Sequence, residues 1–232
     1  MTFEATVAFP SVNPHLAQRM KSFHKNRLPE LEILSLPGHN SFFDAWDAAI
    51  EKASFELLIL THEDVRILGL PNFSLLNMFA EEPKLGMLGV AGTKEINFPD
   101  VWWFSDTRYQ AGLLSGEIFH DTPQMTTPQK MIYGEFGNVV VLDGVCLITT
   151  KERLAKILPE CRKRTYAPWD FYDHVASLEF VKAGYHLRTC GLRIIHDSMG
   201  GGRREAYIAA GEEFSREYLV DPNTGTYRTW SV

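Results

Sequence analysis

Short apolar runs alternate with stretches of helical periodicity through the first 92 residues. Apolar runs bounded by turn residues predict strands, and apolar positions three and four apart predict helices. The expected strands are at residues 4–9, 31–36, 55–61 and 85–91, and the expected helices at 15–25, 41–53 and 70–82. Since crossovers between parallel strands are right-handed, this alternation predicts a doubly wound α/β sheet with helices on both faces.

The run at 55–61 is almost continuously apolar, which is typical of a central strand covered on both faces. The helix at 41–53 begins with the capping-box pattern Ser41-Phe42-Phe43-Asp44 and carries a single apolar stripe. The first half therefore has a well-defined core strand and a helix that packs on it.

The pattern changes after residue 92. Residues 100–128 place aromatic residues among Gly, Ser, Thr and Pro without a helical period, which predicts irregular excursions and a β-ribbon. Further strands are expected at 138–142, 145–149 and 185–195, with helices from 149 to Pro159 and over 170–183. Because no internal repeat or interdomain linker interrupts the chain, residues 1–232 are expected to form one domain.

Composition narrows the class of protein. The chain is 45% apolar and 22% charged, which is close to the globular average. Its net charge of −6, without blocks of like charge, disfavours nucleic-acid binding. No apolar run reaches the ~18–20 residues that span a bilayer, and no secretion signal is visible. Three cysteines without C-x-x-C spacing fit a reducing cytoplasm, with Cys146 and Cys190 interpreted as buried and inert.

The first candidate for chemistry is His62-Glu63-Asp64, directly after the apolar strand. In open α/β sheets, ligands bind outside the carboxyl ends of strands. Carboxylate oxygens at this position suit Mg²⁺ or Mn²⁺ shared with substrate phosphates. The alternative is a solvated turn between strand and loop.

The second candidate is Tyr172-Asp173-His174, in the first turn of an expected helix. A helix N-terminus stabilises a carboxylate, so Asp173 is expected to be ionised and able to act as a general base. The alternative is that Asp170 and Asp173 simply cap the helix.

The third candidate is His196 at a strand end, followed by Gly200-Gly201-Gly202 and then Arg203 and Arg204. The histidine can complete a metal site, and the arginines can close over a diphosphate. It is not a Walker loop, because no Lys-Ser or Lys-Thr follows the glycines. The alternatives are a flexible turn with solvated arginines and a purely structural histidine.

The three candidates occur in the order and on the architecture of GT-A glycosyltransferases, and the chain resembles family-2-like bacterial enzymes of that fold. The resemblance implies an α/β GT-A (nucleotide-diphospho-sugar transferase) fold, with a mostly parallel central sheet, flanking helices and a small β-ribbon excursion. It implies a nucleotide-binding half at about 1–92 and an acceptor half at about 93–202. Residues 203–232 form a C-terminal extension that matches no segment of the family.

The resemblance also implies the chemistry, which is metal-dependent, inverting transfer of a sugar from a nucleotide-diphosphate donor to a glycan or other hydroxyl acceptor. The metal motif reads His-Glu-Asp instead of Asp-x-Asp, which makes Asp64 the main carboxylate ligand of Mn²⁺ or Mg²⁺, with His196 beside it. Asp173 matches the catalytic base. The residues implied for the donor are Pro10, Ser11, Asp44, Asp47, His62, Glu63, Asp143, Gly144, Arg203 and Arg204.

Trp102, Trp103 and Trp169 are candidate platforms for sugar rings, with ordinary core aromatics as the alternative. Two other functions stay open. A sugar nucleotidyltransferase is disfavoured because the first strand ends in Pro10-Ser11-Val12-Asn13, without the glycine-rich basic loop that activates a triphosphate. A non-catalytic module that binds nucleotide sugars or glycans would keep the fold without the reaction. The pattern says nothing about the oligomeric state.

Overall fold

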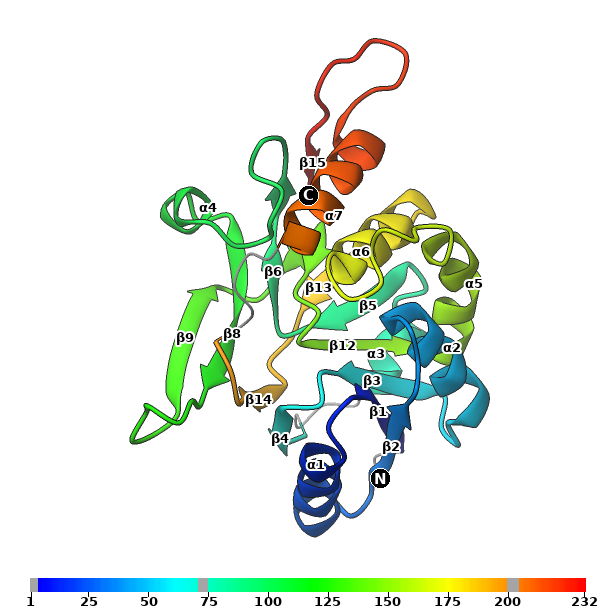
Figure 1. The fold of residues 1–232 in the computed structure, drawn as a ribbon, viewed down its shortest axis with the longest axis vertical. Coiled ribbons are helices and arrows are strands. Elements are labelled where there is room, and N and C mark those ends of the chain that lie inside the picture. Colours follow the sequence, from blue (N-terminus) through cyan, green and yellow to red (C-terminus); the bar gives the residue numbers. More distant parts are fainter. Residues whose placement is uncertain (1–3, 71–74, 200–204) are drawn as a thin grey trace.

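A computed structural model describes residues 4–70, 75–199 and 205–232 (Figure 1). Arg203 and Arg204, with the preceding glycines, lie outside the described residues. The central sheet has seven strands in the order β10-β13-β5-β12-β3-β1-β2. Their bounds are β1 Ala5–Ser11, β2 Glu32–Pro37, β3 Leu57–Thr61, β5 Leu85–Gly89, β10 Asn138–Val139, β12 Cys146–Thr150 and β13 His186–Thr189.

The central sheet is mixed. β1 pairs in parallel with β2 and β3, and β13 with β5. β12 runs antiparallel to both β3 and β5, and β10 antiparallel to β13. Five of the seven strands therefore share one direction. The α/β class predicted from the sequence is confirmed, but β12, from the second half of the chain, separates β3 from β5.

Helices cover this sheet and begin at recognisable caps. Asn13 accepts hydrogen bonds from two backbone N–H groups of α1, and Ser41 from the N–H of Asp44 in α2. α2, α5 and α6 pack side by side in that order, whereas α1 packs against β2 and β4 (Figure 1). The bounds are α1 Pro14–Arg27, α2 Phe42–Lys52, α3 Leu75–Glu81, α4 Asp106–Gln110, α5 Lys151–Cys161 and α6 Tyr172–Lys182.

A second sheet lies beside the first, in the order β11-β6-β8-β14-β4, with β9 paired to β8. The β8–β9 hairpin projects away from the central sheet (Figure 1), and β8 begins inside the segment where a β-ribbon was expected. The bounds are β4 Val65–Gly69, β6 Ala91–Thr93, β8 Leu114–His120, β9 Gln129–Gly134, β11 Val141–Leu142 and β14 Arg193–His196.

Several predicted elements were wrong in their bounds. The strand expected at 85–91 breaks at Val90, and that expected at 185–195 breaks at 190–192, because in each case the chain leaves the central sheet for the second one. β4 was not predicted. α5 passes through Pro159, which lies in its last turn and removes a single N–H donor. α6 begins at Tyr172 instead of residue 170, because Phe171 has a left-handed backbone with φ 60°.

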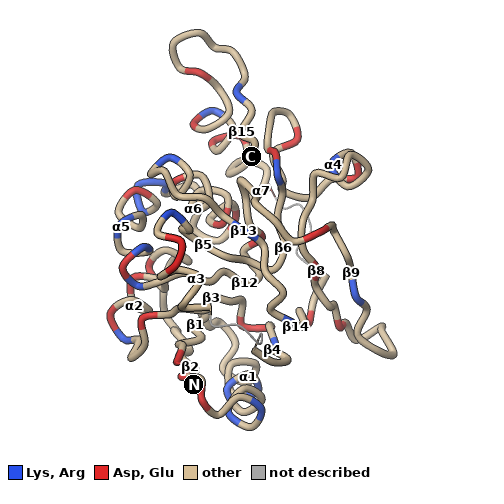
Figure 2. The backbone as a smooth tube through the Cα atoms, turned by 180° about the vertical axis from the view of Figure 1, so that it is seen from behind, with Lys and Arg blue, Asp and Glu red and all other residues tan. Residues whose placement is uncertain are grey.

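The C-terminal segment consists of α7 (Glu205–Phe214), the π-helical η1 (Ser215–Leu219) and β15 (Trp230–Ser231), which pairs with β7 (Glu95–Ile96). No helix in the described ranges combines the length and the apolarity that a bilayer span requires. α1 carries only basic charges, whereas α2 and α5 carry both signs (Figure 2). All three cysteines are buried, as the sequence predicted for Cys146 and Cys190, and burial raises the pKa of Cys190 to about 11.

Candidate active site

The candidate site forms where β3 and β14 end. β3 stops at Thr61, and the next residue is held by a hydrogen bond of 3.3 Å from the His62 N–H to the Val145 carbonyl. β14 pairs antiparallel with β4, and beyond its end the Asp197 N–H donates to the Asp64 carbonyl at 2.9 Å. Since both strands end at this junction, side chains far apart in the sequence come together there.

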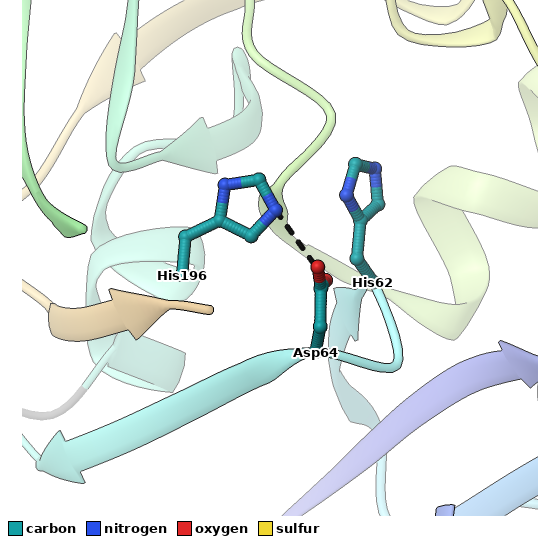
Figure 3. A group of neighbouring side chains, drawn as sticks. All are labelled: His62, Asp64 and His196. Carbon is teal, nitrogen blue, oxygen red and sulfur yellow. Dashed lines mark ion pairs between the residues drawn. The ribbon is translucent and has the colours of Figure 1, made fainter. Parts of the chain in front are cut away.

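Three of these side chains form a cluster (Figure 3). One ligand atom from each of His62, Asp64 and His196 lies within 4.8 Å of the others. His196 Nε2 is 3.3 Å from Asp64 Oδ1 and 2.9 Å from the Ser198 hydroxyl oxygen. Burial alone would raise the pKa of Asp64, but the hydrogen bond and charge of His196 outweigh it and lower that pKa to about 2. Asp64 is therefore ionised at neutral pH.

The hydrogen bonds of His62 fix its tautomer. His62 Nε2 lies 2.7 Å from the Tyr172 hydroxyl, and that hydroxyl donates to the Gly144 carbonyl at 3.0 Å. Because the hydroxyl has a single proton, His62 Nε2 must be the donor to Tyr172. The proton-free nitrogen is then Nδ1, and a ring nitrogen of His62 faces His196 in Figure 3. Burial, helped by His196, lowers the pKa of His62 to about 4, so the ring is neutral.

Tyr172 connects this cluster to the first turn of α6. Its ring stacks on Phe42 of α2, with centroids 3.6 Å apart and an interplanar angle of 12°. Trp169 makes an edge contact with Phe42, with ring centroids 5.3 Å apart and an interplanar angle of 68°. Gly144 leaves the necessary space, because a Cβ atom there would lie 2.1 Å from the Tyr172 hydroxyl oxygen. The sequence pointed to Tyr172 as part of a motif but assigned it no role.

Asp173 is held at both carboxylate oxygens. Oδ2 accepts from the Gly144 N–H at 2.9 Å, and Oδ1 accepts from the N–H and the Nδ1 of His174, each at 2.8 Å. The Trp103 N–H donates to His174 Nε2 at 3.1 Å, so Nδ1 carries the ring proton and donates it to Asp173. Burial would raise the pKa of Asp173, but His174 and the two backbone N–H groups lower it by more.

A second carboxylate lies beside Asp173. Burial, followed by the negative charge of Asp173, raises the pKa of Asp143 to about 6, and Asp143 accepts a hydrogen bond from the Val145 N–H at 3.2 Å. The two neighbouring carboxyl groups therefore have pKa values displaced in opposite directions. Such a pair is typical of sites where one group takes a proton and the other donates a hydrogen bond.

The other residues expected to bind the sugar donor lie in two places, at the end of β1 and at the contact of α2 with the end of α5. Glu63 accepts from the N–H groups of Val12 and Asn13, each at 3.2 Å, and so holds the end of β1, where Pro10 and Ser11 lie, against the end of β3. Asp44 and Asp47 both pair with Arg162, the residue directly after α5, at 3.4 and 2.6 Å. Among the described residues, no hydrogen bond or ion pair joins either of these two acids to the histidine cluster.

The three tryptophans differ in what they offer to a ligand. Trp103 is 5% exposed, and its ring packs on Phe104 and Tyr133. This burial agrees with the alternative interpretation of Trp103 as an ordinary core aromatic. Trp102 is 36% exposed. Trp169 is half-buried beside Phe42, close to the histidine cluster.

One buried histidine near the site was missed. His120, at the end of β8, is the strand neighbour of His196, with ring centroids 5.7 Å apart, and its Nδ1 lies 2.8 Å from the Ser198 carbonyl oxygen. A signal was present in the sequence, since each of the two strands ends in a histidine that is directly followed by an aspartate, at 120–121 and 196–197. Arg66 binds the two aspartates, Asp121 and Asp197, and so ties the strand ends together.

Comparison with known proteins identifies the class. Residues 17–193 match the glycosyltransferase-like family, and this span is about three quarters of the chain. The chain therefore belongs to the glycosyltransferase-like family. No curated protein matches it. A similar solved structure, the crystal structure of A197 from STIV, shares 12% sequence identity over 87% of this chain and 98% of that chain, with a TM-score of 0.46.

Proposed function

We propose that this protein is a metal-dependent inverting glycosyltransferase that moves a sugar from a nucleotide-diphosphate donor to an acceptor hydroxyl. The observation that supports this most is the hydrogen bond between His62 and Tyr172. It joins a group of metal-binding character to the residue directly before Asp173, the proposed base. Charge neutralisation at a leaving diphosphate and proton removal from an acceptor are the two requirements of such a transfer.

The three side chains fit a divalent cation. Asp64 is ionised, His62 is neutral, and its Nδ1 has a lone pair because Nε2 holds the proton. Hydrogen bonds that set the tautomer of a histidine in this way are typical of metal sites. Two imidazoles beside one carboxylate favour Mn²⁺ over Mg²⁺, which prefers oxygen ligands. When bound, the ion would supply Lewis-acid neutralisation of the diphosphate.

Asp173 is the proposed base for the acceptor hydroxyl. His174, through two hydrogen bonds to Oδ1, and the Gly144 N–H, through one to Oδ2, fix the direction of its carboxylate and leave Oδ2 with remaining acceptor capacity. His174 is a positioning residue, since it acts through Asp173. Asp143, with a pKa of about 6, is proposed to hydrogen-bond a hydroxyl of the donor sugar. The nucleoside is proposed to lie at Pro10 and Ser11, with Arg203 and Arg204 on the diphosphate.

The first experiment is a thermal-shift screen of nucleoside diphosphates and nucleotide sugars, each with and without Mn²⁺. A ligand that binds only the folded state raises the unfolding midpoint, and the stabilisation grows with the logarithm of the ligand concentration once this exceeds the dissociation constant. We expect one nucleotide to stabilise the protein only when Mn²⁺ is present. If no nucleotide stabilises the protein under either condition, the donor site is refuted.

The second experiment separates an enzyme from a binding module. Asp173→Asn keeps the shape of the side chain and removes its basicity, so we expect donor turnover to fall by about 10²–10⁴-fold with donor binding retained. Asp106→Asn is the matched control, because Asp106 is an exposed carboxylate in the first turn of α4. Turnover that is equal in both variants would contradict the role of Asp173.

A further inference from the structure

A cavity of about 430 Å³ opens between the C-terminal segment and the loop after β7. Ligand sites for small molecules commonly have volumes of ~300–1,000 Å³. One wall of the cavity is formed by α7, η1 and the chain after them. These elements lie beyond residue 193, where the match to the family ends. Its apolar lining includes Phe98, Trp102, Phe171, Tyr207, Ile208 and Tyr227.

The cavity is next to the proposed base through Phe171. This residue has φ 60°, a conformation that side-chain-bearing residues rarely adopt, and directly precedes Tyr172 and Asp173. Its ring lies 4.9 Å from the ring of His174 and 4.9 Å from that of Tyr207, centroid to centroid. A molecule in the cavity would therefore touch the residue that packs against the positioning histidine.

The walls of the cavity are held in place from behind. Tyr218 of η1 donates to the buried Glu179 of α6 at 2.6 Å, and the Trp230 indole N–H donates to the Tyr218 carbonyl at 2.9 Å. Arg164 forms ion pairs with Glu179 and with Glu217 of η1. These contacts fix the C-terminal segment on α6, so the cavity exists before a ligand arrives.

The lining suits an uncharged sugar ring. Phe98 and Tyr227 stack with centroids 4.4 Å apart and an angle of 4°, and both remain exposed, as does Trp102. Aromatic faces of this kind accept the apolar C–H face of a pyranose. Glu212 lines the same cavity and, among the described residues, has no ion-pair partner, so its carboxylate can accept hydrogen bonds from sugar hydroxyls.

The charges disfavour two other occupants. The Glu212 carboxylate would repel a phosphate, the Arg216 guanidinium in the lining already pairs with Glu213 at 2.8 Å, and the Asp100 carboxylate pairs with Arg108 at 2.9 Å. A lipid chain has no hydrogen-bond donor for the carboxylate of Glu212 in the lining.

We propose that this cavity binds a pyranose ring of the acceptor glycan and that the C-terminal segment thereby selects the acceptor. The inference rests on the proposed function, since it makes the cavity the acceptor side of the same site. It assigns a share in acceptor selection to a part of the chain outside the family match, which closes the cavity against residues inside that match.

The test is saturation-transfer difference NMR with methyl glycosides of glucose, galactose, mannose and their N-acetylamino forms, without donor or metal. We expect at least one glycoside to bind through its ring protons. Truncating a single aromatic platform in Tyr227→Ala or Trp102→Ala should weaken that binding about three- to tenfold. Tyr109→Ala is the matched control, because Tyr109 is 53% exposed, comparable to the 62% of Tyr227, and lies on α4 outside the cavity.

The inference is overturned if no methyl glycoside binds, or if binding is the same in Tyr227→Ala, Trp102→Ala and Tyr109→Ala. 1-Octanol serves as an additional probe for an apolar chain. If it binds and no glycoside does, the cavity is a lipid site and the inference is overturned as well. Failure of the proposed function has a different signature, because turnover would then be absent while glycosides still bind through Tyr227. Turnover that depends on Asp173, without glycoside binding in the cavity, would leave the proposed function standing and reject this inference alone.

Discussion

His62 Nε2 lies 2.7 Å from the hydroxyl oxygen of Tyr172, and this contact links two parts of the site that are 110 residues apart in the chain. The histidine belongs to the cluster with Asp64 and His196, and the tyrosine opens the helix that carries Asp173. Because the Tyr172 proton goes to the Gly144 carbonyl, the same contact sets which nitrogen of His62 is available to a metal ion.

Tyr172→Phe should therefore weaken metal binding without removing a ligand. The phenyl ring keeps the stack on Phe42, but the partner of His62 Nε2 is lost and the imidazole can take the other tautomer. Loss of such outer hydrogen bonds typically reduces metal affinity by about 10–100-fold. Calorimetric titration with Mn²⁺ measures the change, and affinity equal to that of the wild type would refute the tautomer assignment.

Gly144→Ala should disrupt the same region by steric contact. A Cβ atom at this position would lie 2.1 Å from the hydroxyl oxygen and 2.5 Å from Cζ of Tyr172, and 3.0 Å from Cβ of Asp173. Overpacking of this kind costs about 1–3 kcal/mol of unfolding free energy, and the shift of Tyr172 should also weaken Mn²⁺ binding.

Gly69→Ala is the control for this substitution, because a Cβ atom at Gly69 meets nothing within 4 Å. Urea denaturation and Mn²⁺ titration of both variants give the comparison. Equal stability of the two variants would show that the close approach of Gly144 to Tyr172 is not needed.

His174→Phe should change the pH dependence of the reaction. The substitution keeps an aromatic ring against Phe171 and removes the hydrogen bond that lowers the pKa of Asp173. A base must be ionised to act, so a higher pKa moves the acid limb of the pH–rate profile to higher pH. An acid limb that stays in place would assign His174 a purely structural role.

The sequence predicted the individual elements of the site better than their arrangement. The apolar run before His62 and the strand before His196 showed that these residues follow strands, and strand ends are where α/β folds bind ligands. Periodicity did not show that β12 inserts between β3 and β5, because pairing partners depend on tertiary contacts. The contact of Gly144 with Asp173 follows from that insertion.

Local rules also failed where the backbone is unusual. A helix was expected from residue 170 because Asp170 is a good cap, but the left-handed Phe171 delays α6 until Tyr172. Nothing in local propensity predicts a left-handed phenylalanine, since the conformation persists through packing on Tyr207 and Phe214 from the C-terminal segment. Sequence reasoning offered no role for that segment, because it matches no motif.

The last prediction concerns stability and uses His24, a buried residue of α1 far from the site in sequence. His24 Nε2 accepts the Ile67 N–H at 3.0 Å, which requires a neutral ring. Burial lowers the pKa of His24 from 6.5 to about 4, and that of His62 falls similarly. Between pH 4 and pH 6.5 these histidines therefore bind more protons in the unfolded chain than in the folded one. The unfolding free energy should therefore keep its whole contribution from the two neutral histidines above pH 6.5 and decrease as the pH falls toward 4.

Each of the two histidines should contribute a loss of roughly 2–3 kcal/mol between pH 7 and pH 4.5. His24→Gln keeps an acceptor for the Ile67 N–H and cannot take up a proton, so this variant should lose about half as much stability as the wild type from the two histidines. Urea denaturation at both pH values, with EDTA present to exclude metal binding, measures the difference. If the variant and the wild type lose the same amount, His24 does not stay neutral in the folded protein.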